Sequence, residues 1–189
     1  MDQNNSQEIT MKTGSRSLLA QKTQNGLITV NMGHPQLEWN MIPLKENVDL
    51  IDLPIKGNPG AAGMGNPHCV FVVDDVDSVD LLDWGSKIES HELFPQKTNV
   101  EFIQIIDKQN IRQRTFERGV GETLACGSGA CAAAVVANRK GLTDRNVDIH
   151  LGTIHLRRWQ IFTIFTIFDP YPPPVCSFYE YVSANLANF

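Results

Sequence analysis

A cysteine lies where a glycine-rich turn is predicted to become an alanine-rich helix. Gly119 and Gly121 precede Cys126, and the residues 127–129, Gly-Ser-Gly, lead into a run of small residues that starts at Ala130. Backbone N–H groups at a helix start lack intrahelical partners and carry partial positive charge. They favour a thiolate over a thiol, and they can also hold a carboxylate or a phosphate. The pattern therefore predicts an acidic, reactive thiol beside an anion-binding turn.

Three polar side chains are predicted to gather next to this turn, at one end of a β-hairpin. The segments 99–106 and 111–118 both have the composition of strands, and a polar four-residue connection separates them. The simplest register pairs Ile106 with Ile111, and a bulge would shift it by one residue. The hairpin end nearest the turn then carries Asn99, Glu117 and Arg118.

The remaining elements must position these side chains. A helix is predicted over residues 127–140 and ends at Gly141. A near-continuous apolar run indicates a strand at 68–74, buried on both faces. The stretch 54–67 is rich in glycine and proline, which is typical of a linker or loop. Ser78 fits the N-cap of a short helix. Further strands are expected at residues 26–32, 146–151 and 153–159.

Composition and charge narrow the function classes. The chain has 189 residues, of which 42% are apolar and 20% charged, as in an ordinary globular protein of one domain or two small ones. A net charge of −5 without a long basic run argues against a nucleic-acid partner. The polar residues 1–25 contain no secretory signal and indicate a loosely held segment, and no apolar run is long enough to cross a membrane. The four cysteines form no C-x-x-C pair, so we expect a reduced, cytoplasmic protein without a metal site.

Each candidate residue also has a plain structural interpretation. His68 alone fits a structural histidine, and Glu117 with Arg118 fits a surface ion pair of little energetic value. Residues 127–132 match the loose dinucleotide pattern G-x-G-x-x-A, but the residues 119–124 intervene after the preceding strand, which is a poor context for it. Small, buried hydrophobic residues are the ordinary interpretation of Cys69, Cys131 and Cys176.

The combined motifs resemble the diaminopimelate epimerase family. The matching segments, in order and at the expected spacing, are Gly65-Asn66-Pro67-His68-Cys69-Val70, Thr98-Asn99-Val100-Glu101-Phe102 and the run from Glu117 to Cys131. The resemblance implies an enzyme that interconverts LL- and meso-diaminopimelate, on the route to lysine and peptidoglycan precursors, without pyridoxal phosphate, metal or other cofactor. One cysteine removes the α-proton from one face, and a second cysteine delivers a proton to the other. It also implies a small amino-acid substrate and allows a homodimer.

The resemblance assigns roles to individual residues. Cys126 matches one of the two acid/base cysteines, and His68 and Glu117 match the groups that tune them, so the expected catalytic set is Cys126, His68 and Glu117. Racemisation needs opposed proton carriers and a cradle for a carboxylate whose charge grows as the carbanion forms. The expected substrate-binding residues are Asn66, Asn99, Glu117, Arg118, Gly127 and Ser128.

The implied fold is α+β, with a curled mixed or antiparallel β-sheet wrapped around a central helix. We expect one near-complete domain plus a fragment of the first. Residues 1–55 would be a remnant of the N-terminal domain, 56–160 the C-terminal epimerase-like domain with its catalytic helix at 127–140, and 161–189 an atypical tail. The C-G-N-G-type motif that carries the family's other cysteine does not occur in the sequence. We therefore expect an N-terminally truncated chain that is a poor epimerase by itself.

Two other functions stay open at the level of sequence. Proline racemase-like and phenazine-biosynthesis-like isomerases share this architecture in outline, although Asn66, Asn99 and the Glu117-Arg118 pair favour the diaminopimelate branch. The other alternative is a ligand-binding remnant without catalytic activity.

Overall fold

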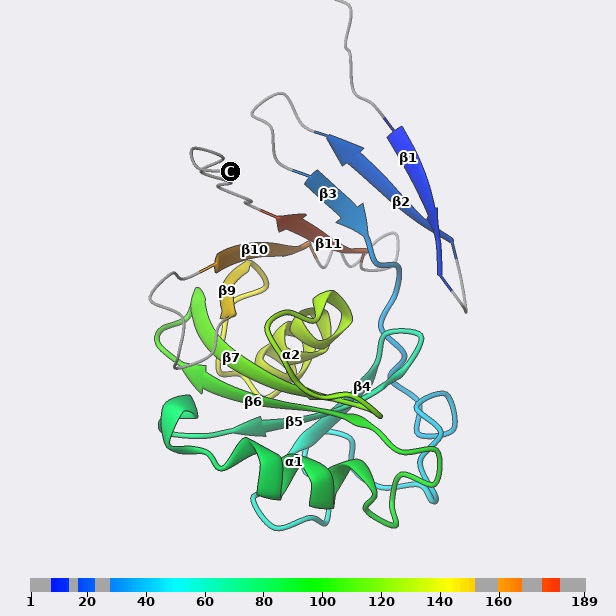
Figure 1. Cartoon of the computed structure of the whole chain (residues 1–189), viewed down its shortest axis with the longest axis vertical. Helices are drawn as coiled ribbons and strands as arrows, with labels where there is room; N and C mark the ends of the chain where they lie inside the picture. The colour runs from blue at the N-terminus through cyan, green and yellow to red at the C-terminus, as the bar shows by residue number, and fades with distance from the viewer. Residues whose placement is uncertain (1–7, 14–16, 23–27, 152–159, 168–174, 181–189) are drawn as a thin grey trace, which may run out of the picture.

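The strands form one mixed sheet that curls around a central helix (Figure 1). The computed structural model describes residues 8–13, 17–22, 28–151, 160–167 and 175–180. Within these ranges the strand order is β1-β2-β3-β11-β10-β9-β7-β6-β5-β4, with β8 paired to β7. The β5–β6 and β7–β9 pairs are parallel and the other pairs are antiparallel. This architecture confirms the expected α+β class and the sheet wrapped around a helix.

The elements follow one another along the chain as strands with three helical segments. Their bounds are β1 Glu8–Lys12, β2 Ser17–Lys22, β3 Ile28–Asn31, β4 Gly60–Gly63, β5 Pro67–Val72, the 3₁₀ helix η1 Val76–Ser78, α1 Leu81–Glu89, β6 Asn99–Ile105, β7 Asn110–Glu117, β8 Gly121–Thr123, α2 Gly127–Arg139, β9 Val147–Leu151, β10 Gln160–Ile167 and β11 Val175–Glu180.

Helix α2 is the centre of the larger core. Its alanine-rich sequence favours a helix and leaves little side-chain volume, so the sheet can approach closely. A Cβ on Gly60 of β4 would lie only 2.5 Å from Val136 Cγ1, which shows how close this approach is. The helix ends as predicted: Lys140 caps it, and Gly141 follows with a φ of +72°.

The stretch 54–67 is not simply a loop, because strand β4 lies inside it. Gly60 pairs with Val70 and Gly63 with Pro67, and all four residues of β4 are buried. The composition that suggested a linker instead gives a strand of very small side chains. Such a strand is what the close approach of α2 requires.

A second apolar core lies on the opposite face of the sheet, under α1. Phe71, Phe102 and Phe116 belong to it, and the rings of Phe71 and Phe102 stack with centroids 5.2 Å apart. Asp80, not Ser78, caps α1: its carboxylate accepts a hydrogen bond from the Asp83 amide at 3.1 Å. The sequence-based assignment of the cap was wrong because Ser78 ends the preceding helix η1.

The β6–β7 hairpin forms as predicted, with a register shifted by one residue. Ile105, not Ile106, pairs with Ile111. The shift arises because the Asp107 carboxylate accepts hydrogen bonds from the Gln109 amide and the Asn110 side chain, so Asn110 joins the strand. The hairpin end near Cys126 still holds the same polar residues.

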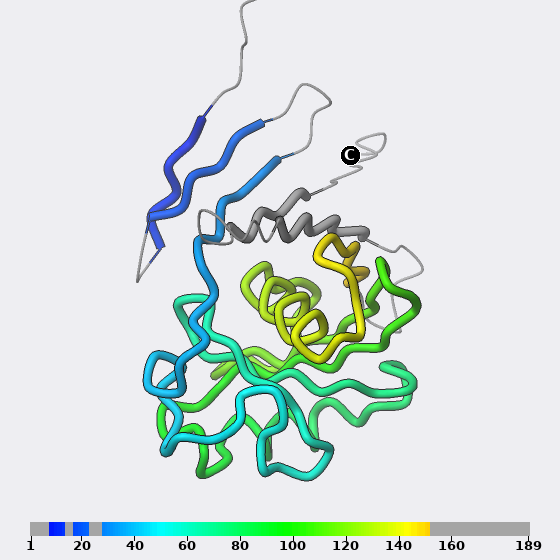
Figure 2. Tube along the Cα trace, turned by 180° about the vertical axis from the view of Figure 1, so that it is seen from behind, coloured from blue at the N-terminus to red at the C-terminus, as the bar shows by residue number. Residues whose placement is uncertain are grey.

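The outer strands complete the sheet on its other side. Residues 1–25, expected to be loosely held, contain β1 and β2, and Figure 2 shows β1–β3 extending away from the body of the chain. Ala20 and Val30 nevertheless pack in the same core as α2. The backbone of β10 pairs with β9, and that of β11 pairs with β3.

The predicted strand at 153–159 lies outside the described residues. The strand at 26–32 and that at 146–151 are confirmed as β3 and β9. The division into residues 1–55, 56–160 and 161–189 stays a prediction. None of the helices in the described segments is both long and apolar enough to span a membrane.

Candidate active site

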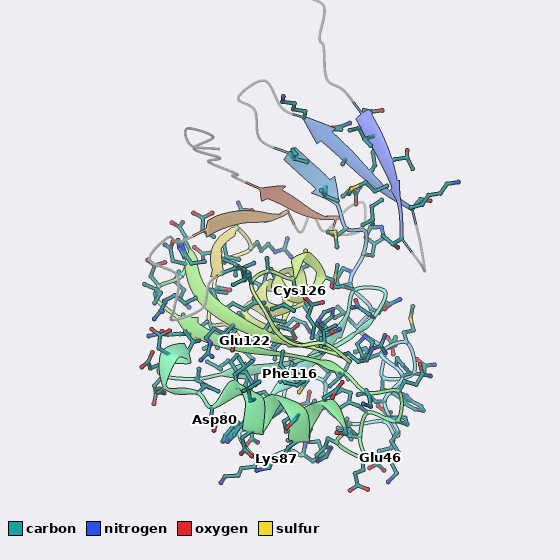
Figure 3. All side chains as sticks on the ribbon, in the orientation of Figure 1. Glu46, Asp80, Lys87, Phe116, Glu122 and Cys126 are labelled. Atoms are coloured by element: carbon teal, nitrogen blue, oxygen red, sulfur yellow. The ribbon has the colours of Figure 1, made fainter. Side chains whose placement is uncertain are left out.

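Cys126 is the N-cap of helix α2. Its backbone is extended, with φ −138° and ψ 105°, and its carbonyl accepts the first helical hydrogen bond from Ala130 at 2.9 Å. The sulfur accepts a hydrogen bond from the Gly129 amide at 3.4 Å, so the thiol itself caps the helix. Figure 3 shows Cys126 beside α2, with Asp80 and Lys87 on the far side of the sheet. The predicted position of the thiol at a helix start is correct.

The predicted acidity of this thiol is wrong. The side chain is 8% exposed, and this burial is the first cause that raises the pKa of Cys126 to about 12. The Glu101 carboxylate raises it further, and Glu117 adds a smaller effect of the same sign. Hydrogen bonds from Ser128 and the Gly129 amide act in the opposite direction. Loss of hydration and two carboxylates therefore outweigh the hydrogen bonds at the helix start.

Three side chains predicted for the site form a connected group with the sulfur of Cys126. His68 Nε2 lies 2.9 Å from Asn66 Oδ1, and Asn66 Nδ2 donates to Ser128 Oγ at 3.5 Å. Ser128 Oγ in turn lies 3.5 Å from the sulfur of Cys126. His68 stands at the start of β5, whereas Ser128 and Cys126 stand at the start of α2. The start of β5 and the start of α2 lie next to each other, and this brings together residues that are about sixty positions apart in the sequence.

Glu101 completes this group, and the sequence analysis gave it no role. Its Oε1 lies 2.8 Å from His68 Nδ1, and both side chains are fully buried. Its neighbours Val100 and Phe102 face the core under α1, so Glu101 points to the α2 face. A charged residue in the middle of an otherwise apolar strand was the signal that could have identified it.

Asn99 and Arg118 form a second hydrogen-bonded pair, and Asn99 lies beside His68 in the sheet. Asn99 Oδ1 accepts a hydrogen bond from the Arg118 backbone amide at 2.9 Å, and Asn99 Nδ2 donates to the Pro67 carbonyl at 3.0 Å. The oxygen and the nitrogen of the buried Asn99 side-chain amide therefore fix the backbone at Arg118 and at Pro67. The Arg118 guanidinium is exposed and donates to the Gln96 carbonyl at 3.0 Å.

Glu117 is held by a residue of the neighbouring strand β8. Thr123 donates its hydroxyl to Glu117 Oε1 at 2.6 Å, which fixes the carboxylate across the β7–β8 pair. Glu117 also contributes to the raised pKa of Cys126. The structure therefore gathers the predicted residues of β5, β6, β7 and the α2 start at one end of the sheet.

Gly127 and Ser128 are the first residues of α2, where backbone amides have no intrahelical partners. Such amides can bind a carboxylate, as the sequence suggested. Cys69 and Cys131 are fully buried in the two cores, like small hydrophobic residues. Cys176 belongs to β11, and its side chain lies outside the described parts of the chain.

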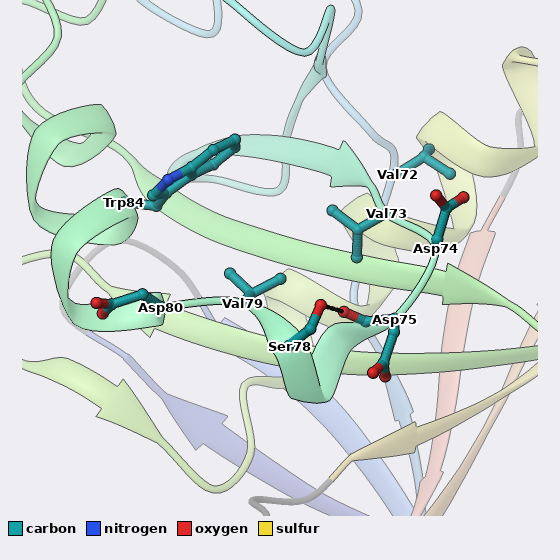
Figure 4. Close-up of a pocket in the computed structure, with 8 residues that line it drawn as sticks. All are labelled: Val72, Val73, Asp74, Asp75, Ser78, Val79, Asp80 and Trp84. Atoms are coloured by element: carbon teal, nitrogen blue, oxygen red, sulfur yellow. Dashed lines mark hydrogen bonds between the residues drawn. The ribbon is translucent and has the colours of Figure 1, made fainter.

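A surface pocket lies at the other end of β5, away from His68. Figure 4 shows its lining, with the Trp84 ring on α1 and the Ser78 hydroxyl bonded to the Asp75 carbonyl at 2.8 Å. None of the residues predicted for the site contributes to it. The lining residues are Val72, Val73, Asp74, Asp75, Ser78, Val79, Asp80 and Trp84.

Comparisons with known proteins match the sequence resemblance. A family model described as diaminopimelate epimerase matches residues 60–155. The diaminopimelate epimerase of Rhodospirillum centenum is 44% identical over 148 residues, which are 76% of this chain and 51% of the relative. That of Acinetobacter baumannii strain AYE is 42% identical over 163 residues, which are 82% of this chain and 58% of the relative. The chain thus spans about half the length of the curated relatives it matches.

Solved structures show the same fold at low sequence identity. A phenazine biosynthesis protein of the PhzF family from Bacillus anthracis has a TM-score of 0.60 at 14% identity, over 92% of this chain and 64% of that one. A hydroxyproline epimerase from Agrobacterium vitis has a TM-score of 0.59 at 12% identity, over 95% of this chain and 57% of that one. At such identities these likenesses show the fold alone.

Proposed function

The chain belongs to the diaminopimelate epimerase family, and we propose that it carries one acid/base half of a cofactor-independent epimerisation of diaminopimelate. In this proposal the substrate's α-carbon loses a proton to one thiol and gains a proton from another. The product would serve lysine and peptidoglycan precursor synthesis in the cytoplasm. The observation that carries the proposal is the buried Cys126 thiol at the start of α2, surrounded by the residues that the family resemblance assigns to it.

Cys126 acts in this scheme first as the proton donor. Burial and the Glu101 and Glu117 carboxylates raise its pKa to about 12, so the thiol keeps its proton at neutral pH. A protonated thiol can deliver that proton to a carbanion at the α-carbon. In the reverse direction Cys126 must lose its proton to become the base, and the α-ammonium group of the bound substrate would favour this by offsetting the nearby carboxylates.

The start of α2 suits the α-carboxylate of the substrate. As the α-proton leaves, negative charge spreads onto this carboxylate, and donors already aimed at it stabilise the transition state. The amides of Gly127 and Ser128 are such donors. Glu117 fits the α-ammonium group, and the exposed Arg118 guanidinium fits the carboxylate end. Asn66 and Asn99 would shape the binding site through the hydrogen bonds described above.

A two-thiol reaction needs a second cysteine on the opposite face of the substrate. The C-G-N-G-type motif of the family does not occur among the 189 residues. We therefore propose that in this chain, by itself, the Cys126 thiolate takes the α-proton slowly from one face, exchanges it with solvent and returns a solvent proton to the same face, without rapid interconversion of the isomers. Assembly as a homodimer belongs to the same proposal.

The test is incubation of the chain with LL- and meso-diaminopimelate in D₂O, followed by NMR and chiral chromatography. We expect slow incorporation of deuterium at an α-carbon, with little interconversion of LL and meso forms. Proline serves as the matched control substrate, because the fold is shared with proline racemase-like enzymes, and we expect no exchange with it. Exchange with proline but not with diaminopimelate would overturn the substrate assignment. No exchange with either, together with calorimetric binding of diaminopimelate, would identify a non-catalytic binding protein.

A further inference from the structure

Glu101 is a fully buried carboxylate with an incomplete set of partners. Its Oε1 lies 2.8 Å from His68 Nδ1. In the part of the chain that the structure describes, its Oε2 has no hydrogen-bond partner. Burying a carboxylate is costly unless it is paired and hydrogen-bonded. An acidic side chain retained here at such a cost points to a role beyond packing.

The carboxylate lies directly against the start of α2. A Cβ placed on Gly129 would be 2.5 Å from Glu101 Oε1 and 3.2 Å from the Cys126 sulfur. The space left by the missing side chain of Gly129 therefore separates the carboxylate from the thiol. Consistent with this geometry, Glu101 has a larger effect on the pKa of Cys126 than Glu117 does.

A chain of polar contacts leads from Glu101 to the sulfur. The contacts join Glu101 to His68 at 2.8 Å, His68 to Asn66 at 2.9 Å, Asn66 to Ser128 at 3.5 Å and Ser128 to Cys126 at 3.5 Å. The last two contacts are the longest. Each side chain from His68 to Ser128 can donate and can accept a hydrogen bond. The hydrogen bonds along this series of contacts can therefore all point from His68 toward Cys126 or all point the other way.

The two directions correspond to two proton arrangements. In the first, His68 Nε2 donates to Asn66 Oδ1, Asn66 donates to Ser128, and the hydroxyl is left to donate to a thiolate. A half-turn of the Asn66 amide reverses each donation. The thiol then donates to Ser128 Oγ, the hydroxyl donates to the amide, and the amide donates to a neutral imidazole. A proton on both ring nitrogens thus accompanies the thiolate, and a neutral ring accompanies the thiol.

Glu101 decides where the neutral ring keeps its proton. A carboxylate beside one ring nitrogen of a histidine holds the proton there and fixes the tautomer and the orientation of the ring. Here that nitrogen is Nδ1, so Nε2 is left to face Asn66. Without this carboxylate, the contact of Nε2 with Asn66 would be left to hold the ring.

We propose that Glu101 is a positioning residue that, through His68, ties the proton on the Cys126 thiol to the proton on the imidazole. The coupling runs through the hydrogen bonds of Asn66 and Ser128. The inference rests on the proposed function only in taking Cys126 as the reacting thiol. Among the described residues, the charged groups that act on this thiol are Glu101 on β6 and Glu117 on β7, and His68 on β5 reaches it through Asn66 and Ser128.

The first test compares Glu101→Gln with the wild-type chain by the rate at which iodoacetamide alkylates Cys126, followed by mass spectrometry of its peptide. Glutamine keeps the size of the side chain and removes the charge. Loss of the carboxylate charge favours the thiolate directly, whereas loss of the partner of His68 disfavours the doubly protonated ring that accompanies the thiolate. Only the second effect passes through Ser128, so we expect Glu101→Gln to accelerate the alkylation of Cys126 at pH 8 about tenfold more in a Ser128→Ala background than in the wild-type chain. Cys131 on the same helix is the internal control, and its labelling should not change. The matched variant is Glu122→Gln, which removes a carboxylate paired with Arg114 at 2.9 Å and should label like wild type.

Two results would overturn the proposal. One is an equal change in the alkylation rate of Cys126 on Glu101→Gln in the wild-type chain and in the Ser128→Ala background. The other is a parallel increase at Cys126 and Cys131, because general loosening of the fold would expose both thiols. The alkylation measurement contains no diaminopimelate, so its result does not depend on whether the chain exchanges the α-proton of diaminopimelate.

A second measurement needs no change at Glu101, in case that variant does not fold. Capping Cys126 with methyl methanethiosulfonate removes its proton donor, and ring-nitrogen NMR of His68 follows the response. We expect the ring-nitrogen chemical shifts of His68 at a fixed pH to change on capping in the wild-type chain and not in Ser128→Ala, where the contact chain is cut. Ring-nitrogen shifts of His68 that are unaffected by capping the wild-type thiol would contradict the coupling.

Discussion

At the scale of single residues, the surroundings of Cys126 decide its chemistry more than its place at a helix start does. The sulfur caps α2 and receives the Gly129 amide, yet burial and two carboxylates keep the thiol protonated. A protonated thiol is the right starting state for a proton donor. Sequence alone identified the residue but not its protonation, because burial and the approach of Glu101 arise only in the folded chain.

This environment predicts an unusual pH profile for the thiol. Only the thiolate reacts with iodoacetamide. An ordinary cysteine reaches its full alkylation rate somewhat above its pKa of about 8.5. Because the pKa of Cys126 is raised to about 12, its rate should keep increasing about tenfold per pH unit between pH 8 and 10. Mass spectrometry of the Cys126 peptide measures this, with free glutathione as the control thiol. A plateau of the Cys126 rate below pH 9 would contradict the buried, carboxylate-flanked thiol.

At the scale of elements, helix and strand ends assemble the site. The start of α2 brings Cys126 and Ser128, the start of β5 brings His68, and the hairpin end brings Asn99 and Glu117. The hairpin keeps this convergence although its register differs by one residue from the expected one. Helix α1, on the other face of the sheet, stabilises this arrangement from below through the second apolar core.

The cap of α1 offers a direct comparison between the sequence-based assignment and the structure. Asp80 accepts the Asp83 amide, whereas Ser78 donates to the Asp75 carbonyl. Replacing Asp80→Ala should lower the free energy of unfolding by about 1 kcal/mol, the usual cost of losing an N-cap. Ser78→Ala is the matched variant, and it should cost less than about half of that. Urea unfolding measures both, and a larger loss for Ser78→Ala would restore Ser78 as the cap.

At the scale of the whole molecule, α2 unites the strands on its two sides in one core. Val30 of β3 packs with the same buried group as Val70 of β5 and Ile103 of β6, although β3 lies far from them in the sheet order. The described parts of the chain should therefore unfold together. A site at the start of α2 depends on both sides of this core.

This arrangement predicts that a small cavity in β3 weakens the entire fold. Val30 is buried, so Val30→Ala should lower the free energy of unfolding by about 1–3 kcal/mol. Far-UV circular dichroism and tryptophan fluorescence should report the same midpoint in urea, since Trp84 on α1 would unfold with the rest. Ile28→Ala, on the same strand but with a side chain that is 39% exposed, should change much less. Separate transitions for the two probes would contradict a shared core.

The elements that a short stretch of sequence encodes could be predicted from the sequence. The apolar run of β5, the alanine-rich α2 with Gly141 at its end, and the β6–β7 hairpin were all predicted. Strand β4 was missed because its glycines and alanines are needed for the approach of α2, a requirement that a sequence window does not contain. Glu101 was missed for a similar reason, since its partner His68 comes from the neighbouring strand. The hairpin register predicted that Asn99, Glu117 and Arg118 lie together, and the family resemblance supplied the roles of Asn66, His68 and Ser128.

The most direct test of the central claim is α-proton exchange of diaminopimelate in D₂O by variants of the two cysteines of α2. Cys126→Ser keeps a small polar group at the helix cap but removes the thiol, and we expect it to abolish the exchange. Cys131→Ala is the matched control, because that side chain is buried among alanines, and we expect it to retain the exchange of the wild-type chain. Exchange that persists in Cys126→Ser at the wild-type rate would contradict the assignment of Cys126 as the proton-transferring thiol.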